Sequence, residues 1–298
     1  MFSNTRLFLS EDYDSKTNVF IWGYDLMKTF TLRNGTDLAE LIPERGGIVT
    51  RLQLEGHDIL YLNKDTLDDL EANVRGGIPI LFPISGQLEE KQYEWGTQTY
   101  TMNNHGFARN LPWEVVTQDE DTVTLRLTSN DVTKAAYPFD FKLEFTYRLN
   151  NEGLIIEQNY TNLSEEQMPM YAGFHPYFRT AEKAIVVESD ATIMLDYNDH
   201  DVKPFDGVVD LNGLKESIAL LDTEQSYVVF ELPEIEAKVR LSYGDEFPYV
   251  VFWTEEGKDF VCVEPWMAKN GEFHRKNELV CVKPGETLKT FIQITIER

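Results

Sequence analysis

Histidine and cysteine are scarce in this chain, and several kinds of motif are missing from it. The 298 residues include five histidines and two cysteines. No stretch approaches the run of roughly 18 to 20 apolar residues that a membrane-spanning helix needs. The glycine-rich motifs that hold nucleotide phosphates and the Gly-x-Ser-x-Gly motif of serine hydrolases do not occur. We therefore expect neither a membrane-spanning segment nor a nucleotide cofactor.

Basic residues are also few, with 27 lysines and arginines against 51 aspartates and glutamates, a formal net charge of -24. A surface with this excess of negative charge repels the phosphates of nucleic acids and anionic lipids. The composition therefore predicts a protein that binds neither nucleic acid nor a membrane. Any anionic small substrate would depend on a local cluster of arginines.

The two cysteines, Cys262 and Cys281, each stand between valines in an apolar run. This setting favours two buried free thiols over a disulfide, in keeping with a cytoplasmic protein. With no pair of histidines nearby they do not make a zinc site, and we expect no metal. The residues from Met1 to Ser10 lack the basic region and apolar run of a signal peptide, so we expect none.

Strand-like alternation of polar and apolar residues recurs along the chain and is the main evidence for the fold. Segments with this period of two lie at residues 122–128, 142–148, 154–160, 237–242 and 290–296. Turn-forming residues separate them, with Asn150–Gly153 as a predicted hairpin turn and Lys283–Glu286 before the last segment. No long segment keeps a 3.6-residue apolar repeat, although short helical turns are possible at 65–73 and 129–136.

Many strands, few helices and no alternation of strands with helices predict an all-β fold. The architecture we expect is a single-domain antiparallel β-sandwich, or a related closed form, over residues 1–298. No linker rich in proline, glycine or serine divides the chain, and no repeat of propeller or solenoid length occurs. Residues 180–225 are more polar and irregular, so they could form excursions over a binding face.

Two of the five histidines lie in segments otherwise suited to burial. His105, within Asn104–Arg109, is either a turn-capping residue or a site residue. His175, within the aromatic segment Tyr171–Phe178, is either a hydrogen-bonded core residue or the polar centre of an aromatic-lined pocket. Aromatic rings stack on the apolar faces of sugars, while a few polar groups bind the hydroxyls. The other histidines lie in polar surroundings and are expected at the surface: His57, His200 and His274.

Among the many carboxylates, Glu264 is singled out by its surroundings. It follows the apolar run Phe260–Val263 and precedes a Pro-Trp pair. Partial desolvation there would raise its pKa towards neutrality, which suits a general acid or base. The alternative is a carboxylate that pairs with Arg75 or Arg109 at the end of a strand. Asp206, ahead of a glycine, is ordinarily a turn residue, with a functional role as the alternative.

Four motifs occur in the same order as in a known family: Arg75–Pro83, His105–Arg109, His175–Phe178 and Val263–Trp266. Together they resemble the aldose 1-epimerases of the galactose mutarotase-like superfamily, over about residues 15–296. The forms of the first two are more similar to divergent branches, which include mutarotase-related proteins of sugar operons and hexose-6-phosphate 1-epimerases. The resemblance implies a β-supersandwich with an open, concave sugar site and a reaction that uses no cofactor.

The resemblance also implies roles for three catalytic residues. Glu264 matches the general base that removes the proton of the C1 hydroxyl, and His175 matches the general acid that protonates the ring oxygen. His105 matches a second active-site histidine, which holds the ring oxygen or a neighbouring hydroxyl. A glutamate and a histidine can exchange the acid and base roles in the reverse direction, and we expect the pair to act across about the width of a pyranose.

Three further residues match positions that contact the substrate. Arg75 matches the arginine that grips substrate hydroxyls, and Asp206 falls roughly where the family keeps a hydroxyl-binding aspartate. Arg109 could pair with a carboxylate or face an anionic substituent. Pro176 departs from the small polar residue that standard mutarotases tend to carry there, which bears on the choice of sugar.

The function predicted is that of an aldose 1-epimerase, which interconverts the α and β anomers of a hexose. A close variant acts on a hexose 6-phosphate, and then arginines should converge on one rim of the pocket. A second class is a non-catalytic sugar-binding protein on the same fold. A glycoside hydrolase or lyase would need a second carboxylate facing Glu264, for which Asp206 is the nominee. The expected partner is a small-molecule sugar or sugar phosphate, and the expected state is a monomer or homodimer.

Overall fold

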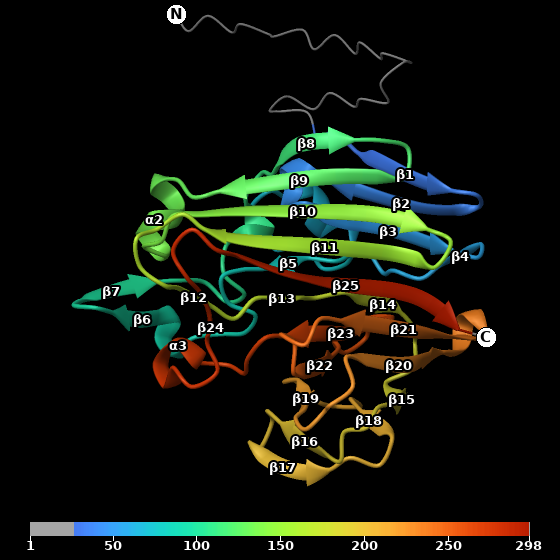
Figure 1. The fold of residues 1–298 in the computed structure, drawn as a ribbon. Coiled ribbons are helices and arrows are strands. Elements are labelled where there is room, and N and C mark those ends of the chain that lie inside the picture. The colour runs from blue at the N-terminus through green and yellow to red at the C-terminus, as the bar shows by residue number, and fades with distance from the viewer. Residues whose placement is uncertain (1–26, 298) are drawn as a thin grey trace, which may run out of the picture.

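The computed structural model describes residues 27–297, which form antiparallel sheets (Figure 1). A nine-stranded sheet runs across the front of the view, and an eight-stranded sheet lies behind it and reaches the lower edge. Apolar side chains form one large core cluster with members from Phe30 to Ile294. The predicted all-β antiparallel architecture is confirmed. The single domain over residues 1–298 stays a prediction. The described part leaves out residue 298 and residues 1–26, which include the segment Met1–Ser10.

The nine-stranded sheet consists largely of strands whose side chains alternate between core and solvent. In β10 every second side chain from Phe141 to Leu149 is buried. The ring centroids of Phe145 and Tyr160 lie 5.3 Å apart in this core. In spatial order the strands are β18 (Val208–Asp210), β15 (Ala184–Glu188), β20 (Tyr227–Leu232), β21 (Ala237–Tyr243), β25 (Thr287–Glu297), β11 (Gly153–Asn162), β10 (Phe141–Asn150), β9 (Thr122–Thr128) and β8 (Glu114–Gln118).

The eight-stranded sheet carries the candidate site. In spatial order it contains β17 (Asp201–Pro204), β16 (Ile193–Asp196), β19 (Ile218–Leu220), β22 (Tyr249–Trp253), β23 (Phe260–Trp266), β13 (Gly173–Phe174) and β5 (Ile80–Leu81), with β14 (Tyr177–Arg179) also paired to β23. Strand β23 is buried along its whole length. Val261 and Val263 belong to the main core. Because successive side chains of a strand point to opposite faces, Glu264 faces away from that core.

Smaller elements complete the structure. The other strands are β1 (Phe30–Asn34), β2 (Asp37–Ile42), β3 (Ile48–Leu54), β4 (His57–Asp58), β6 (Gln92–Trp95), β7 (Gln98–Thr101), β12 (Met168–Met170) and β24 (Val280–Val282). The α-helices are α1 (Lys64–Asp68), α2 (Asp131–Ala136) and α3 (Glu272–Arg275), and the 3-10 helices are η1 (Pro43–Arg45), η2 (Glu89–Lys91), η3 (Ala108–Asn110) and η4 (Pro233–Ile235). Within residues 27–297, no helix has the length and apolar composition to cross a membrane.

The predicted strand segments all lie in strands of the nine-stranded sheet, namely β9, β10, β11, β21 and β25. The predicted hairpin turn is confirmed, since Asn150 of β10 is paired with Gly153 of β11. The two expected helical turns correspond to α1 and α2. The alternation of polar and apolar residues was sufficient to predict these strands, because each of them has one face in the core.

The prediction for the cysteines is correct for only one of them. Both thiols are free, and Cys262 is buried, but Cys281 is exposed. Cys281 lies in the short strand β24, which forms a two-stranded sheet with β12. In this strand it is Val282 that is buried, so the neighbouring cysteine faces outward.

Arg45 is 4% exposed and organises a loop that leads to the candidate site. Its guanidinium donates hydrogen bonds of 2.6 to 3.4 Å to the backbone oxygens of Thr66, Leu67, Asp69, Leu70 and Ala72. The same loop ends at Arg75, whose backbone N–H donates to Thr66 Oγ1 at 2.9 Å. Arg45 therefore holds together the segment from which Arg75 projects.

We expect the substitution Arg45→Met to lower the free energy of unfolding by about 3 kcal/mol or more, because it leaves these carbonyl oxygens without their charged donor. Chemical denaturation measures this change. Arg51→Met is the matched control, because Arg51 forms an exposed ion pair with Asp58. Loss of an exposed pair costs less than about 1 kcal/mol. Equal effects of the two substitutions would contradict the role given to Arg45.

Candidate active site

A cavity of about 270 Å³ lies where the face of β23 that points away from the core meets the loops around it. Four of the six predicted site residues line it: Arg75, His105, His175 and Glu264. These residues are up to 189 positions apart in the sequence (264 − 75). The fold thus brings together residues that the sequence could connect only by motif.

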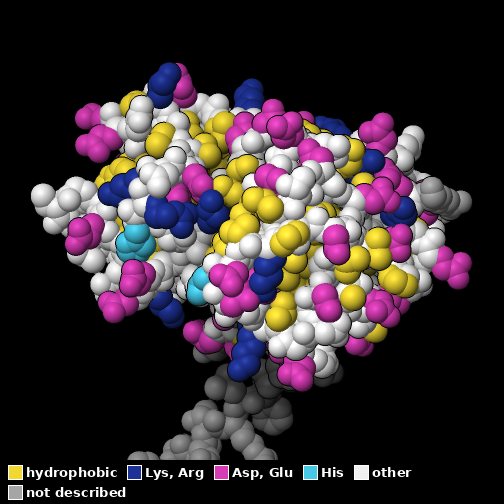
Figure 2. Space-filling view, turned by 90° about the horizontal axis from the view of Figure 1, so that it is seen from below, with side chains coloured by type: hydrophobic (Ala, Val, Ile, Leu, Met, Phe, Trp, Pro, Cys, Tyr) yellow, Lys and Arg dark blue, Asp and Glu magenta, His cyan; other side chains and the backbone are white. Residues whose placement is uncertain are grey.

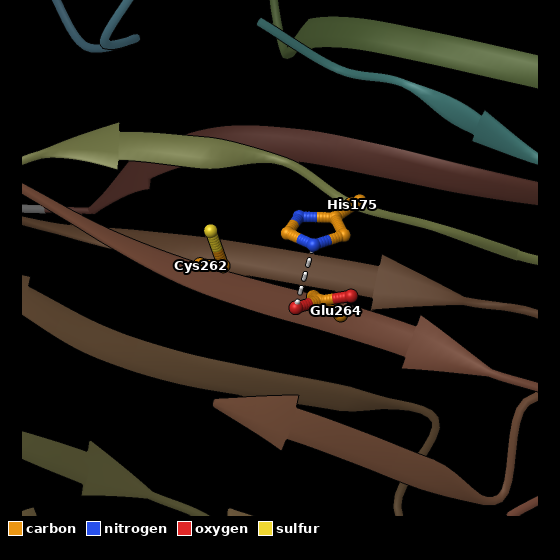
Figure 3. A group of neighbouring side chains, drawn as sticks. All are labelled: His175, Cys262 and Glu264. Atoms are coloured by element: carbon orange, nitrogen blue, oxygen red, sulfur yellow. Dashed lines mark ion pairs between the residues drawn. The ribbon is translucent and has the colours of Figure 1, made fainter. Parts of the chain in front are cut away.

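Glu264 and His175 form the centre of the cavity (Figure 3). His175 Nε2 lies 3.4 Å from Glu264 Oε1. The other carboxyl oxygen, Oε2, accepts a hydrogen bond of 3.0 Å from Trp266 Nε1. The His175 ring stacks on Tyr177 with ring centroids 4.7 Å apart, and its backbone N–H donates to Pro79 O at 3.1 Å. Both side chains are therefore held in place before any substrate binds.

Burial moves the pKa values of this pair in opposite directions. Glu264 is 1% exposed, and removal from water raises the pKa of its carboxyl well above 4.5, opposed by the Trp266 hydrogen bond and the charge of Arg109. Burial, with the neighbouring His105 and Arg109, holds the pKa of His175 well below 6.5. No arginine in residues 27–297 forms an ion pair with Glu264. The alternative of a carboxylate neutralised by Arg75 or Arg109 is therefore not what the structure shows.

His105 is held in one tautomer by its local backbone. Its φ angle is 65°, and the next residue, Gly106, also has a positive φ of 70°. A Cβ atom on Gly106 would lie 2.1 Å from Phe82 O, so only glycine fits there. His105 Nδ1 lies 2.5 Å from Ser85 O. Because a carbonyl only accepts, Nδ1 carries the proton and Nε2 is left as an acceptor.

The charge state of His105 follows from the same surroundings. Burial and the nearby Arg109 lower the pKa of His105 to about 3. The imidazole is therefore neutral near neutral pH. Its ring centroid lies 5.3 Å from that of His175, in an edge-to-face arrangement. A neutral imidazole with a free Nε2 can accept a hydrogen bond from a hydroxyl but cannot protonate an oxygen there.

Arg75 forms part of the cavity wall and remains partly exposed. Its guanidinium carbon lies 5.1 Å from the centre of the Trp253 ring. Arg75 Nε is 3.9 Å from Glu255 Oε2, in a pair whose side chains are 45% and 41% exposed. Such a long, exposed pair restrains the guanidinium only weakly. Arg75 therefore has no strong ion pair to Glu255 and contributes a positive charge to the cavity wall.

Arg109 and Asp206 are not among the residues that line the cavity. Arg109 donates from Nη2 to Asn104 O at 3.1 Å, and its Nε is buried with no hydrogen-bond partner among residues 27–297. Burial lowers the pKa of Arg109 to about 10. Asp206 is exposed between β17 and β18, where the chain passes from one large sheet to the other. The structure therefore does not bring Asp206 to the other candidates, and it places Arg109 behind them.

Several lining residues carry no signal in the sequence. Lys215 and Ser217 reach the cavity from the polar segment 180–225, in agreement with the expectation that this segment lies near a binding face. Asn270 and Trp253 also line it. Each of these comes from a loop or strand whose relation to β23 depends on long-range pairing. Trp266 and Asn104 also line the cavity, and both belong to segments that the sequence analysis quotes, so they could have been found from the sequence.

One group of side chains in the described part of the chain lies close enough together to hold a metal ion. The ligand atoms of His175, Cys262 and Glu264 lie within 4.8 Å of one another. Burial and the Glu264 charge raise the pKa of the Cys262 thiol, and a thiol is a poor ligand until it loses its proton. Within the described part of the chain His175 Nδ1 is buried with no hydrogen-bond partner, whereas the second ring nitrogen of a metal-binding histidine normally donates to a neighbour. The arrangement therefore suits proton transfer better than cation binding.

Solved structures share this fold. The Slr1438 protein from Synechocystis sp. PCC 6803 superposes with a TM-score of 0.88 at 34% sequence identity, over 93% of this chain and 98% of that chain. The galactose mutarotase related enzyme from Lactobacillus acidophilus superposes with a TM-score of 0.76 at 22% identity, over 91% of this chain and 97% of that chain. The architecture is therefore that of the galactose mutarotase-like proteins.

The sequence comparisons then define the family. The profile described as Aldose 1-epimerase matches residues 28–295, and the chain belongs to the aldose 1-epimerase family. The chromosomal protein LacX of Lactococcus lactis subsp. lactis is 25% identical over 74% of this chain and 85% of its own length. A protein of Escherichia coli (strain K12) named "Putative glucose-6-phosphate 1-epimerase" is 28% identical over 43% of this chain and 40% of its own length. The resemblance based on four motifs is confirmed at the level of the family.

The raised pKa of Glu264 predicts how stability depends on pH. The folded protein keeps this proton at pH values above 4.5, at which the unfolded chain has lost it. The folded state therefore loses stability as pH rises from 4.5 towards the folded pKa. Glu264→Gln keeps an oxygen that can accept from Trp266 but does not titrate. We expect it to be more stable than the wild type at pH 8, by more than about 1 kcal/mol, and close to it at pH 4.5.

Thermal or chemical unfolding at the two pH values measures this difference. His175 acts in the opposite direction below pH 6.5, because its folded pKa is lowered, so the measurement at pH 8 is the one that reports on Glu264. Glu152→Gln, in the exposed turn between β10 and β11, is the control and should show no such pH-dependent gain. A destabilised Glu264→Gln variant at pH 8 would show that the carboxylate is stabilised rather than strained by its site.

Proposed function

We propose that this protein interconverts the α and β anomers of a hexose by opening and closing the sugar ring. The observation that carries the proposal is the 3.4 Å separation of His175 Nε2 and Glu264 Oε1 on the floor of the cavity. An acid and a base at this distance can act on two oxygens of one substrate. Membership of the aldose 1-epimerase family supports this reaction class.

The reaction needs one proton removed and one proton supplied. The pair reacts with its one proton on His175 Nε2 and with Glu264 ionised, so the proton that Glu264 holds in the free protein first passes to His175. Glu264 then takes the proton of the C1 hydroxyl, and the electron pair of that O–H bond forms the carbonyl. The bond from C1 to the ring oxygen breaks, and the ring oxygen takes a proton from His175. Rotation about the C1–C2 bond presents the other carbonyl face, and the reverse transfers close the ring as the other anomer.

The spacing of the pair differs from the expectation of about one pyranose width. Both reacting oxygens are bonded to C1, so they lie much closer together than opposite edges of the ring. The 3.4 Å separation suits this hemiacetal geometry. The reaction requires that Glu264 and His175 together hold one proton. With no proton the pair contains no acid, and with two protons it contains no base. A raised pKa for Glu264 and a lowered one for His175 both widen the pH range in which one proton is present.

The neighbouring residues hold the sugar. His105 presents an unprotonated Nε2, so in this proposal it accepts from a sugar hydroxyl rather than donating to the ring oxygen. Arg75 binds hydroxyls from the wall, and the Trp253 ring beside it offers an apolar surface. Arg109 acts through its charge on the histidines. Asp206 has no part in this arrangement.

A hexose 6-phosphate is the second candidate substrate. The observation that favours it is that two basic residues, Arg75 and Lys215, line the cavity. Arg75 lies over the Trp253 ring, and Trp253 Nε1 donates to the backbone oxygen of Lys215 at 3.1 Å. The expected convergence of Arg75 with Arg109 on one rim does not occur, so Lys215 would be the second cation. The relative from Escherichia coli carries a name of this kind.

The remaining expectations belong to the same proposal. A purely sugar-binding role is disfavoured by the matched acid–base pair, which binding alone would not need. A hydrolase would require a second carboxylate opposite Glu264, and Asp206 does not line the cavity. Two free cysteines agree with a cytoplasmic location. A monomer or homodimer that binds neither nucleic acid nor membrane remains the expected state.

Anomer exchange measured by NMR magnetisation transfer between the α and β C1 protons tests the proposal. Glucose, galactose and glucose 6-phosphate should be compared with catalytic amounts of protein. We expect faster exchange for at least one of them, and a loss of about 100-fold or more in Glu264→Gln and in His175→Asn. Sugar binding should persist in Glu264→Gln, because the amide preserves the shape of the side chain.

His57→Asn is the matched control, because His57 is exposed on β4 and does not line this cavity. It should exchange anomers at the wild-type rate. Full activity in Glu264→Gln would remove Glu264 from the mechanism. Equal effects of His175→Asn and His57→Asn would mean that the wrong histidine has been chosen.

A further inference from the structure

We propose that Trp266 is a positioning residue, whose indole N–H keeps Oε1 of Glu264 turned towards His175 and favours the ionised carboxylate that acts as the base. The inference rests on the proposed function, because it takes Glu264 as the group that removes the C1 hydroxyl proton. Trp266 Nε1 donates to Glu264 Oε2 at 3.0 Å, and Glu264 Oε1 lies 3.4 Å from His175 Nε2. Figure 3 shows one carboxyl oxygen facing the imidazole, which leaves the other for the indole.

The indole ring has little freedom to move, because two glycines make room for it and strands hold it on both sides. Trp266 is buried. A Cβ atom on Gly86 would lie 3.0 Å from Trp266 Cζ3, and one on Gly173 would lie 3.1 Å from Trp266 Cδ1. Trp266 of β23 is paired with Gly173 of β13 and with Tyr249 of β22. The ring is therefore closely surrounded, and its N–H points in a fixed direction.

The loop that packs on the indole also holds His105. Ser85 O lies 2.5 Å from His105 Nδ1, and Gly86 O accepts from the His105 N–H at 2.8 Å. Ser85 Oγ donates to Ala268 O at 3.2 Å, two residues beyond Trp266. The rings of His105 and Trp266 meet edge to face, with centroids 6.1 Å apart. The indole therefore belongs to the same set of contacts that orients the second histidine of the cavity.

The indole also determines which carboxyl oxygen of Glu264 carries a proton. An indole N–H donates and never accepts, so Oε2 serves Trp266 as an acceptor. In a neutral carboxyl group the carbonyl oxygen is the better acceptor, so the proton is left on Oε1. This is the oxygen that lies 3.4 Å from His175 Nε2. The proton can therefore pass to the imidazole without rotation of the carboxyl group.

A local donor to Glu264 matters in this protein because the overall charge opposes ionisation of a buried carboxyl group. The formal net charge is -24, and Figure 2 shows acidic side chains spread over the face that it views. Burial raises the pKa of the Glu264 carboxyl, and the Trp266 hydrogen bond lowers it part of the way back. A hydrogen bond to a charged acceptor is about twice as strong as one to a neutral acceptor, so the indole favours the ionised state.

Trp266→Phe tests the role of the N–H, because it keeps an aromatic ring and removes the donor. We expect the carboxyl carbon of Glu264, followed by NMR in labelled protein, to titrate at a higher pH than in the wild type. For whichever of glucose, galactose and glucose 6-phosphate exchanges fastest, kcat should fall about tenfold or more, with a smaller change in KM. The alkaline limb of the pH–rate profile should move to higher pH together with the titration.

Trp266→3-benzothienylalanine separates the donor from the shape of the ring. This side chain keeps the bicyclic ring and carries sulfur in place of the N–H, so it preserves the packing against Gly86 and Gly173. It should reproduce both the shifted titration and the fall in kcat. Wild-type values of both in this variant would overturn the inference and leave the proposed function standing. A rise in KM alone would also overturn it and would make Trp266 a stacking surface for the sugar.

Trp113→Phe is the matched control. Trp113 is also buried, its Nε1 donates to Ala108 O at 3.1 Å, and it does not line the cavity. This variant should exchange anomers and titrate Glu264 as the wild type does. An equal shift of the Glu264 titration in Trp113→Phe and Trp266→Phe would contradict a specific role for Trp266. No anomer exchange by the wild type would contradict the proposed function itself, while the Glu264 titration in the Trp266 variants would still decide whether the indole stabilises the carboxylate.

Discussion

The site depends on a buried carboxyl group that has an imidazole beside it and no ion pair to a cation in the described chain. Glu264 lies 3.4 Å from His175, and its other contact is the neutral N–H of Trp266. Desolvation raises the pKa of the acid and lowers that of the imidazole, so that one proton can be exchanged between them. Such a group costs stability, which is expected at a functional site.

The sheet structure explains how the fold tolerates the loss of stability that a buried carboxyl group causes. In β23, Val261 and Val263 pack into the main core, while Glu264 lies on the opposite face. The strand is paired on both sides, so the carboxyl cannot move to water without disrupting the sheet. The positive φ of His105 and the network around Arg45 similarly fix loops against this face. The catalytic groups are therefore positioned by the same contacts that stabilise the fold.

Much of the fold was predictable because alternation in strands such as β10 is a local property. The neighbourhood of His105, His175, Glu264 and Arg75 was predictable only through the family motifs. Asp206 fits its motif loosely, and the structure places it in a crossover between sheets. The short distance between acid and base follows from the register in which β13 and β14, on either side of His175, pair with β23. That register depends on pairing between distant segments, which no local pattern contains.

The most direct test of this account is the titration of the Glu264 carboxyl group itself. Its carbon signal can be followed by NMR in protein labelled at the glutamate carboxyl and assigned by comparison with Glu264→Gln. The account predicts that this carbon titrates well above pH 4.5. A Glu264 signal that titrates at or below 4.5 would show a stabilised carboxylate, and the proposed proton-sharing pair would then be wrong.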